Sequence, residues 1–150
     1  MSGALNWINE WHRRACPKPT VRQFEVQLGC HLEEVSEMLE AFELKSDGHH
    51  ELLVDVQIRL AALSILLKTG EAEVRTDRID RDGLLDSLAD QVVTAVGVGY
   101  RAHMDVVGAI DAVDRSNWSK FDIQGQPIFD SNGKVLKGPY YQPPKLEGFY

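Results

Sequence analysis

The stretch His31-Leu32-Glu33-Glu34-Val35-Ser36-Glu37-Met38-Leu39 places an acidic cluster inside a segment with helical periodicity. Glu33, Glu34 and Glu37 fall close together on one side, because neighbours on a helix surface are three or four residues apart. Alone, the cluster fits either a solvated acidic face or a set of hard oxygen ligands for Mg²⁺ or Mn²⁺. The opposite side is an apolar stripe that predicts an amphipathic helix, formed by Val21, Phe24, Leu28, Leu32, Val35, Leu39 and Phe42.

The composition of the chain narrows the class of protein. Its 150 residues are 43% hydrophobic and 26% charged, as in an ordinary globular protein. We expect one domain over residues 1–150, with a helical core over about 4–115 and a C-terminal arm over 116–150. The formal net charge of -7 argues against nucleic acid or an anionic membrane as the partner.

The sequence also bears on location. No apolar run reaches the ~18 residues that a membrane span requires. Residues 1–7 lack the basic start and apolar core of a signal peptide. Cys16 and Cys30 show no metal or redox spacing and fit free thiols. We therefore expect a cytoplasmic protein.

Hydrophobic periodicity predicts four to five helices, and the predicted fold is an all-α bundle with an irregular C-terminal arm. Thr20 suits the N-cap of the second helix, and Gly70 suits the C-terminal stop of the third. Asn132-Gly133 between two short β-prone runs predicts a hairpin within the arm. The expected helices cover residues 4–14, about 20–44, 49–68, about 83–102 and 104–113.

A second acidic pair lies in the helix expected over residues 83–102. Asp86 and Asp90 are four residues apart, and apolar residues occur nearly all round this segment, which is typical of a buried helix. Two buried carboxylates without partners are costly, so cations must satisfy them. One alternative is pairing with Arg59 or Arg101. Metal ions shared with the Glu33–Glu37 cluster are the more economical explanation, as in bundles whose facing helices hold metals.

These two helices resemble the all-α nucleoside triphosphate pyrophosphohydrolases, in the MazG-like single-domain branch of phages and bacteria. Beside the two acidic helices, the resemblance rests on Asn117-Trp118-Ser119-Lys120 and on the arm Gly133–Tyr140, and it covers about residues 20–145. The chain departs from the usual Glu-x-x-Asp of the second helix, because Ser87 precedes Asp90 by three residues. This departure leaves open which aspartate is the direct ligand and how many metals bind.

The resemblance implies hydrolysis of a (deoxy)nucleoside triphosphate between the α- and β-phosphates, which gives the monophosphate and pyrophosphate. Mg²⁺ or Mn²⁺ held by Glu34, Glu37, Asp86 and Asp90 would bridge the phosphates and activate a water. Glu33 is the candidate for orienting or deprotonating that water. The arm resembles that of phage enzymes acting on purine deoxynucleotides, so dGTP or dATP is the first substrate to test.

Residues outside the acidic cluster are candidates for holding the substrate. Lys120, Lys134 and Lys137 could neutralise phosphate charge, with Asn117 donating a hydrogen bond, and ordinary surface solvation is the alternative for Lys134 and Lys137. Gln27 could read a base edge or ribose. Trp7 and Trp11, one turn apart, could stack on a base, although such a pair more often belongs to the core or to a subunit contact.

The sequence also fits two alternative interpretations. One is a phosphoribosyl-ATP pyrophosphatase-like enzyme, against which the arm and the helix at 49–68 argue. The other is a non-catalytic helical interaction protein with merely solvated acids. For the enzyme we expect a homodimer or homotetramer, because a bundle of this size hardly encloses a nucleotide alone.

Overall fold

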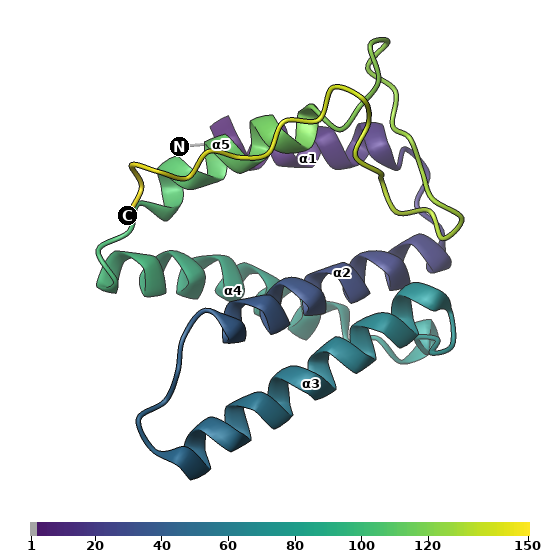
Figure 1. Ribbon diagram of the computed structural model, residues 1–150. Helices are drawn as coiled ribbons and strands as arrows, with labels where there is room; N and C mark the ends of the chain where they lie inside the picture. Colours follow the sequence, from purple (N-terminus) through teal and green to yellow (C-terminus); the bar gives the residue numbers. More distant parts are fainter. Residues whose placement is uncertain (1–2) are drawn as a thin grey trace. The chain divides into compact units, whose positions relative to one another are not determined.

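The computed structural model describes residues 3–150, and the regular elements within them are helices (Figure 1). The all-α prediction is therefore confirmed. None of the helices in this part of the chain is both long and apolar enough to cross a membrane. The elements are α1 (Gly3–Ala15), α2 (Val21–Glu40), α3 (Asp47–Thr69), the 3₁₀ helix η1 (Thr76–Arg78), α4 (Arg81–Arg101) and α5 (Val106–Trp118).

The described chain forms two compact units. The first unit contains the residues up to Pro17 together with Thr76–Phe129 and Val135–Tyr150, and the second contains Lys18–Arg75 and Asp130–Lys134. The expected single domain over 1–150 stays a prediction, and its residues 1 and 2 lie outside the described part.

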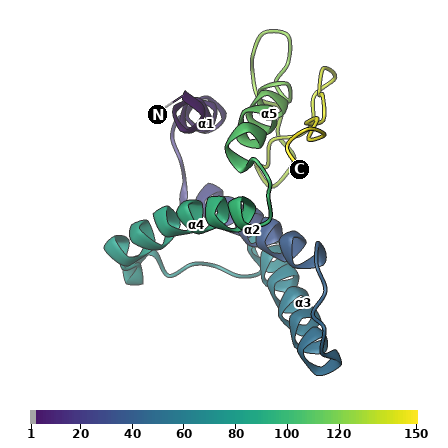
Figure 2. The same cartoon turned by 90° about the vertical axis from the view of Figure 1, so that its left-hand side faces the viewer.

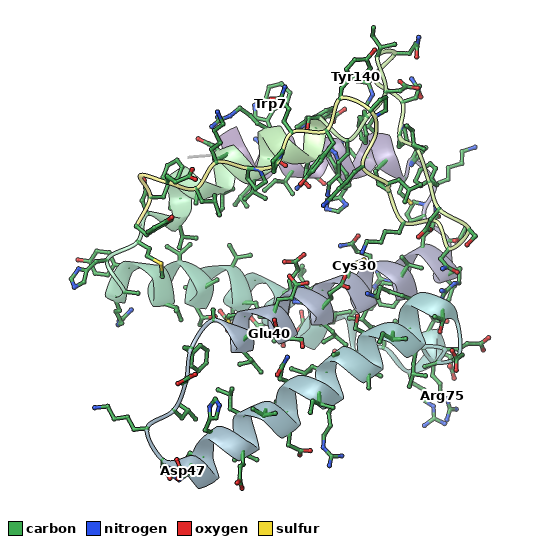
Figure 3. All side chains as sticks on the ribbon, in the orientation of Figure 1. Trp7, Cys30, Glu40, Asp47, Arg75 and Tyr140 are labelled. Atoms are coloured by element: carbon green, nitrogen blue, oxygen red, sulfur yellow. The ribbon has the colours of Figure 1, made fainter. Side chains whose placement is uncertain are left out.

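The second unit is built on an antiparallel pair of helices, α2 and α3. Ser36 of α2 donates to the carbonyl of Gln57 at 3.1 Å, and the Gln57 amide donates to Glu40 at 2.6 Å. Nearer the start of α2, Gly29 lies against Ser64 and Leu67 near the end of α3, so the two helices run in opposite directions. Glu40 and Asp47, which Figure 3 labels, mark the helix ends that the connecting loop joins.

Specific residues fix the start of α2 and the end of α3. Thr20 and Gln23 form a reciprocal capping box at the start of α2, as its sequence predicts. Gly70 ends α3 with a φ of 84°, a left-handed conformation that favours glycine. Arg22 donates to the carbonyl of Leu67 at 2.6 Å and also to that of Lys68, which satisfies carbonyl groups in the last turn of α3.

The first unit has an aromatic core between α1 and α5. Trp11, Ala15 and Phe121 are buried together, and the Trp11 indole N–H donates to the carbonyl of Asn117 at 2.9 Å. The Trp11 and Phe121 rings stack with their centroids 5.6 Å apart. This core ties the N-terminal helix to the residues that follow α5.

A tight connection joins α4 to α5 and receives the C-terminal arm. Gly99 permits it, because a Cβ there would lie 2.1 Å from Val106. The arm then follows α5 in the opposite direction (Figures 1 and 2). Ser116 donates to the carbonyl of Gln142 at 2.7 Å, and the Asp105 N–H donates to the carbonyl of Phe149 at 2.7 Å.

The hairpin predicted around Asn132-Gly133 is present. Phe129 and Val135 form an antiparallel bridge, and Gly133 has a φ of 82°. Asp130 closes the turn, because its Oδ1 accepts from the backbone N–H groups of Asn132 at 2.8 Å and Lys134 at 2.9 Å. The Asp130–Lys134 tip belongs to the second unit although its flanks belong to the first.

Three sequence expectations differ from the structure. The helix expected to reach about residue 44 ends at Glu40, and the helix expected to end at residue 113 continues to Trp118. The third difference concerns α4, which was predicted to be buried. Its side chains are instead largely exposed, with Leu85 at 69% and Val93 at 67%. Hydrophobic periodicity indicates that a helix has an apolar face, but it does not indicate which segment covers that face.

Candidate functional site

The acidic face of α2 is built as the sequence predicts, with one difference among its members. Glu34 and Glu37 are exposed and lie one helical turn apart. Glu33 is half-buried and takes part in ion pairs. Two of the three glutamates thus keep their carboxylates in solvent, where a cation has access to them.

Glu33 is held by two lysines from distant parts of the sequence. Its Oε1 accepts from the Lys68 Nζ at 2.6 Å, and its Oε2 accepts from the Lys134 Nζ at 3.3 Å. The hydrogen bond from Lys68, the largest effect, and the contacts with Lys134 lower the pKa of Glu33, against an opposing contribution from burial. A carboxylate with a lowered pKa is a weaker proton acceptor, which weighs against Glu33 as the base and favours an electrostatic role.

The predicted metal ligands are divided between the two units. Glu34 and Glu37 lie on α2 in the second unit, whereas Asp86 and Asp90 are exposed on α4 in the first unit. Each unit offers a pair of hard oxygen donors, which is the donor chemistry that Mg²⁺ prefers. Within residues 3–150, no group of three or more metal-binding side chains is clustered. The shared metal site stays a prediction.

The two arginines considered as partners for the aspartates are engaged within their own helices. Arg59 pairs with Asp55 at 2.8 Å, and Arg101 donates to the carbonyl of Gly97 at 3.1 Å. The structure therefore gives no support to the arginine alternative, and Asp86 and Asp90 keep their carboxylates on an exposed surface.

The aromatic candidates separate into a core residue and a surface residue. Trp11 is 9% exposed, and Phe121 and His12 contact its ring, which favours the packing alternative for it. Trp7 is 59% exposed and contacts Trp118 edge to face, with the ring centroids 6.1 Å apart. Of the two indoles, only that of Trp7 offers a surface to a base.

The remaining substrate-binding candidates lie in several places. The Lys120 Nζ is 5.9 Å from the Trp11 ring centroid, and the Lys137 Nζ is 4.7 Å from that of Tyr141. Asn117 is half-buried in the last turn of α5, and Gln27 is exposed on α2. Lys134 is therefore the candidate lysine that the structure places beside the acidic face of α2.

Two charged residues of interest, Lys68 and Asp114, are not singled out by the sequence pattern. Lys68 contacts Glu33, and an antiparallel pairing of α2 with α3 would have placed the last turn of α3 near the first half of α2. Asp114 of α5 is buried, and burial, with a smaller contribution from Asp111, raises its pKa against the effects of Arg115 and Trp118. The sequence pattern does not indicate a buried Asp114, because the predicted helix ends at residue 113, one position before it.

Comparison of the chain with protein-family models, curated proteins and solved structures gives no match.

Proposed function

We propose that this protein is a metal-dependent (deoxy)nucleoside triphosphate pyrophosphohydrolase that releases pyrophosphate and leaves the monophosphate. The observation that carries the proposal is the exposed Glu34–Glu37 pair on α2 beside the two lysines of Glu33. Carboxylates suit a divalent cation, and lysines suit the phosphates that the cation would bridge. The resemblance of the two acidic helices to MazG-like enzymes supplies the reaction type.

The proposed role of each residue follows from the chemistry of its side chain. Glu34 and Glu37, with Asp86 and Asp90, would hold Mg²⁺ or Mn²⁺, which supplies charge neutralisation and activation of a water. Lys120, Lys134 and Lys137 would neutralise phosphate charge, and Trp7 would stack on the base. We place this activity in the cytoplasm, with a nucleotide rather than a nucleic acid as substrate.

The direct test is product analysis with each dNTP and NTP in the presence of Mg²⁺ or Mn²⁺. We expect monophosphate and pyrophosphate in equal amounts, loss of turnover on chelation, and the highest rate with dGTP or dATP. Glu34→Gln should abolish turnover, whereas Glu43→Gln, a change at an exposed glutamate beyond the end of α2, should not. Absence of pyrophosphate from every nucleotide, with folded protein, would refute the proposal.

A second candidate function is a helical interaction protein, and one observation favours it. Several large apolar side chains of α3 are exposed, with Leu52 at 61%, Ile58 at 59% and Ile65 at 54%. Exposed apolar patches larger than a few hundred Å² usually mark a partner surface. These side chains would serve the homodimer or homotetramer expected of the enzyme, with a second copy as the partner.

Mass measurement in solution tests the second copy. We expect a mass of at least twice 16.8 kDa for the chain. Ile58→Asp should lower that mass, because a buried unpaired carboxylate opposes association. Glu43→Ser, a change in the exposed connection between α2 and α3, is the control. A monomer at all concentrations would refute the homo-oligomer.

A further inference from the structure

Two lysines converge on a single carboxylate in the second unit. Lys68 comes from the last turn of α3, Lys134 from the tip of the hairpin, and both donate to Glu33 of α2. The Lys68 side chain is 18% exposed, the Glu33 side chain 32% and the Lys134 side chain 45%. The group is thus accessible from solvent but partly withdrawn from it, so charges there are less screened than on an open surface.

Each lysine is placed by a specific feature of the backbone. Lys68 crosses α2 at Gly29, where a Cβ would lie 2.8 Å from the Lys68 Cγ. Lys134 is set by the Asp130 turn, in which Asp130 Oδ1 accepts from the Lys134 backbone N–H. Both lysines are therefore positioned by the backbone. Gly29 lets the Lys68 side chain approach α2 closely, and the turn at Asp130 orients Lys134.

The two ammonium groups share one ion-pair partner. Lys68 and Lys134 both pair with Glu33, and within residues 3–150 neither forms an ion pair with Glu34, Glu37 or Asp130. Asp130 lies near Lys134, and its Oδ1 accepts from the N–H groups of the turn. An ammonium has three donors, and the bond to Glu33 uses one on each lysine. The remaining donors are available to an incoming anion or to water.

We propose that Lys68 and Lys134 form a binding subsite for a phosphate group, with Glu33 holding the two ammonium groups together until an anion arrives. The oxygens of a phosphate are spaced much like those of a carboxylate, so a phosphate bridges the same two donors. The identification of this phosphate with part of a nucleotide's polyphosphate chain rests on the proposed function. Glu33, being partly exposed, rotates toward solvent as the phosphate takes over its bonds.

Calorimetric titration with tripolyphosphate, in the presence of a chelator, tests the subsite without metal and without turnover. Lys68→Met and Lys134→Met should each weaken binding about tenfold, because each change removes a charge-assisted hydrogen bond to the anion. Lys45→Met, at an exposed lysine in the connection between α2 and α3, is the matched control and should bind as the wild type does. Circular dichroism establishes that each variant is folded.

Glu33→Gln separates a binding subsite from a purely structural clamp. Removing the competing negative charge should tighten tripolyphosphate binding about fivefold, since a like charge nearby costs about 1 kcal/mol. A structural clamp predicts no gain in affinity. Unchanged binding in Lys134→Met, an exposed turn residue that should fold normally, would overturn the proposal, as would equal losses in Lys45→Met.

The outcome distinguishes the subsite from the proposed function. Lysine-dependent tripolyphosphate binding without hydrolysis of any nucleotide would support the subsite and refute the enzyme. Hydrolysis with an unchanged KM in both lysine variants would support the enzyme and refute the subsite.

Discussion

Gly29 of α2 lies so close to Ser64 of α3 that a Cβ on the glycine would be 2.9 Å from the Ser64 carbonyl oxygen. That carbonyl belongs to a helix backbone and cannot rotate away. The contact therefore sets how near the two helices come, and the same approach brings Lys68 across α2 to Glu33.

Gly29→Ala should destabilise the protein by about 1–3 kcal/mol, because the added methyl forces a backbone shift in a packed interface. Chemical denaturation gives the free energy of unfolding. The control is Gly48→Ala, near the start of α3, where a Cβ has no heavy atom within 4 Å. Alanine is the better helix former, so this change should stabilise by about 0.5–1 kcal/mol. Equal effects at the two glycines would contradict the close approach.

The pairing of Glu33 makes stability depend on pH. The folded-state pKa of Glu33 is lowered from its ordinary 4.5, so the carboxylate binds its proton more readily in the unfolded state. Its stabilisation is complete above the ordinary value and is lost as the pH falls through the lowered folded-state value. Relative to Glu33→Gln, the wild type should be about 1 kcal/mol more stable at neutral pH.

Urea denaturation at several pH values measures that difference. It should shrink toward zero as the pH falls below 4.5. High salt should reduce it at neutral pH, because Glu33 is partly exposed. A difference that stays constant down to strong acid would show that the ion pairs do not stabilise the fold.

Trp11 and Trp7 should respond differently to truncation. Trp11→Ala removes a buried ring from the core of the first unit and should cost about 3–5 kcal/mol. Trp7→Ala acts on a ring that is 59% exposed and should cost under about 1 kcal/mol. Thermal unfolding followed by circular dichroism compares the two. If Trp7 stacks on a base, Trp7→Ala should raise the KM for nucleotide while the melting temperature changes little.

The helices were predictable because local signals agree with one another. Thr20, Gly70 and Asn132-Gly133 each act through the backbone of their own segment, and the structure places a cap, a stop and a turn there. The end of α5 was missed because Ser116 and Asn117 indicate a loop locally. Ser116 instead lies within the helix and donates its hydroxyl to the carbonyl of Gln142, in a distant segment of the chain.

The candidate site was predictable in its residue types and not in its pairings. The exposed position of Glu34 and Glu37 follows from periodicity on α2. The partners of Glu33 do not, because Lys68 and Lys134 reach it only through the register of α2 with α3 and the placement of the hairpin. Burial of α4 was inferred from its apolar residues, but an apolar helix requires a partner, and sequence periodicity does not say which one.

Glu37→Gln and Asp90→Asn test, in one reaction, whether α2 and α4 both contribute ligands to a common metal site. Both side chains are exposed, so neither change removes packing, and helical content and unfolding free energy should stay within about 0.5 kcal/mol of the wild type. If both carboxylates hold the same cations, each variant should lose at least about a hundredfold in kcat with dGTP. The double variant should lose little more than either single one, because residues that act as a unit are non-additive. Raising the Mn²⁺ concentration should restore part of the rate in each single variant. Independent, multiplicative losses would show that the two acidic pairs do not serve a common metal site.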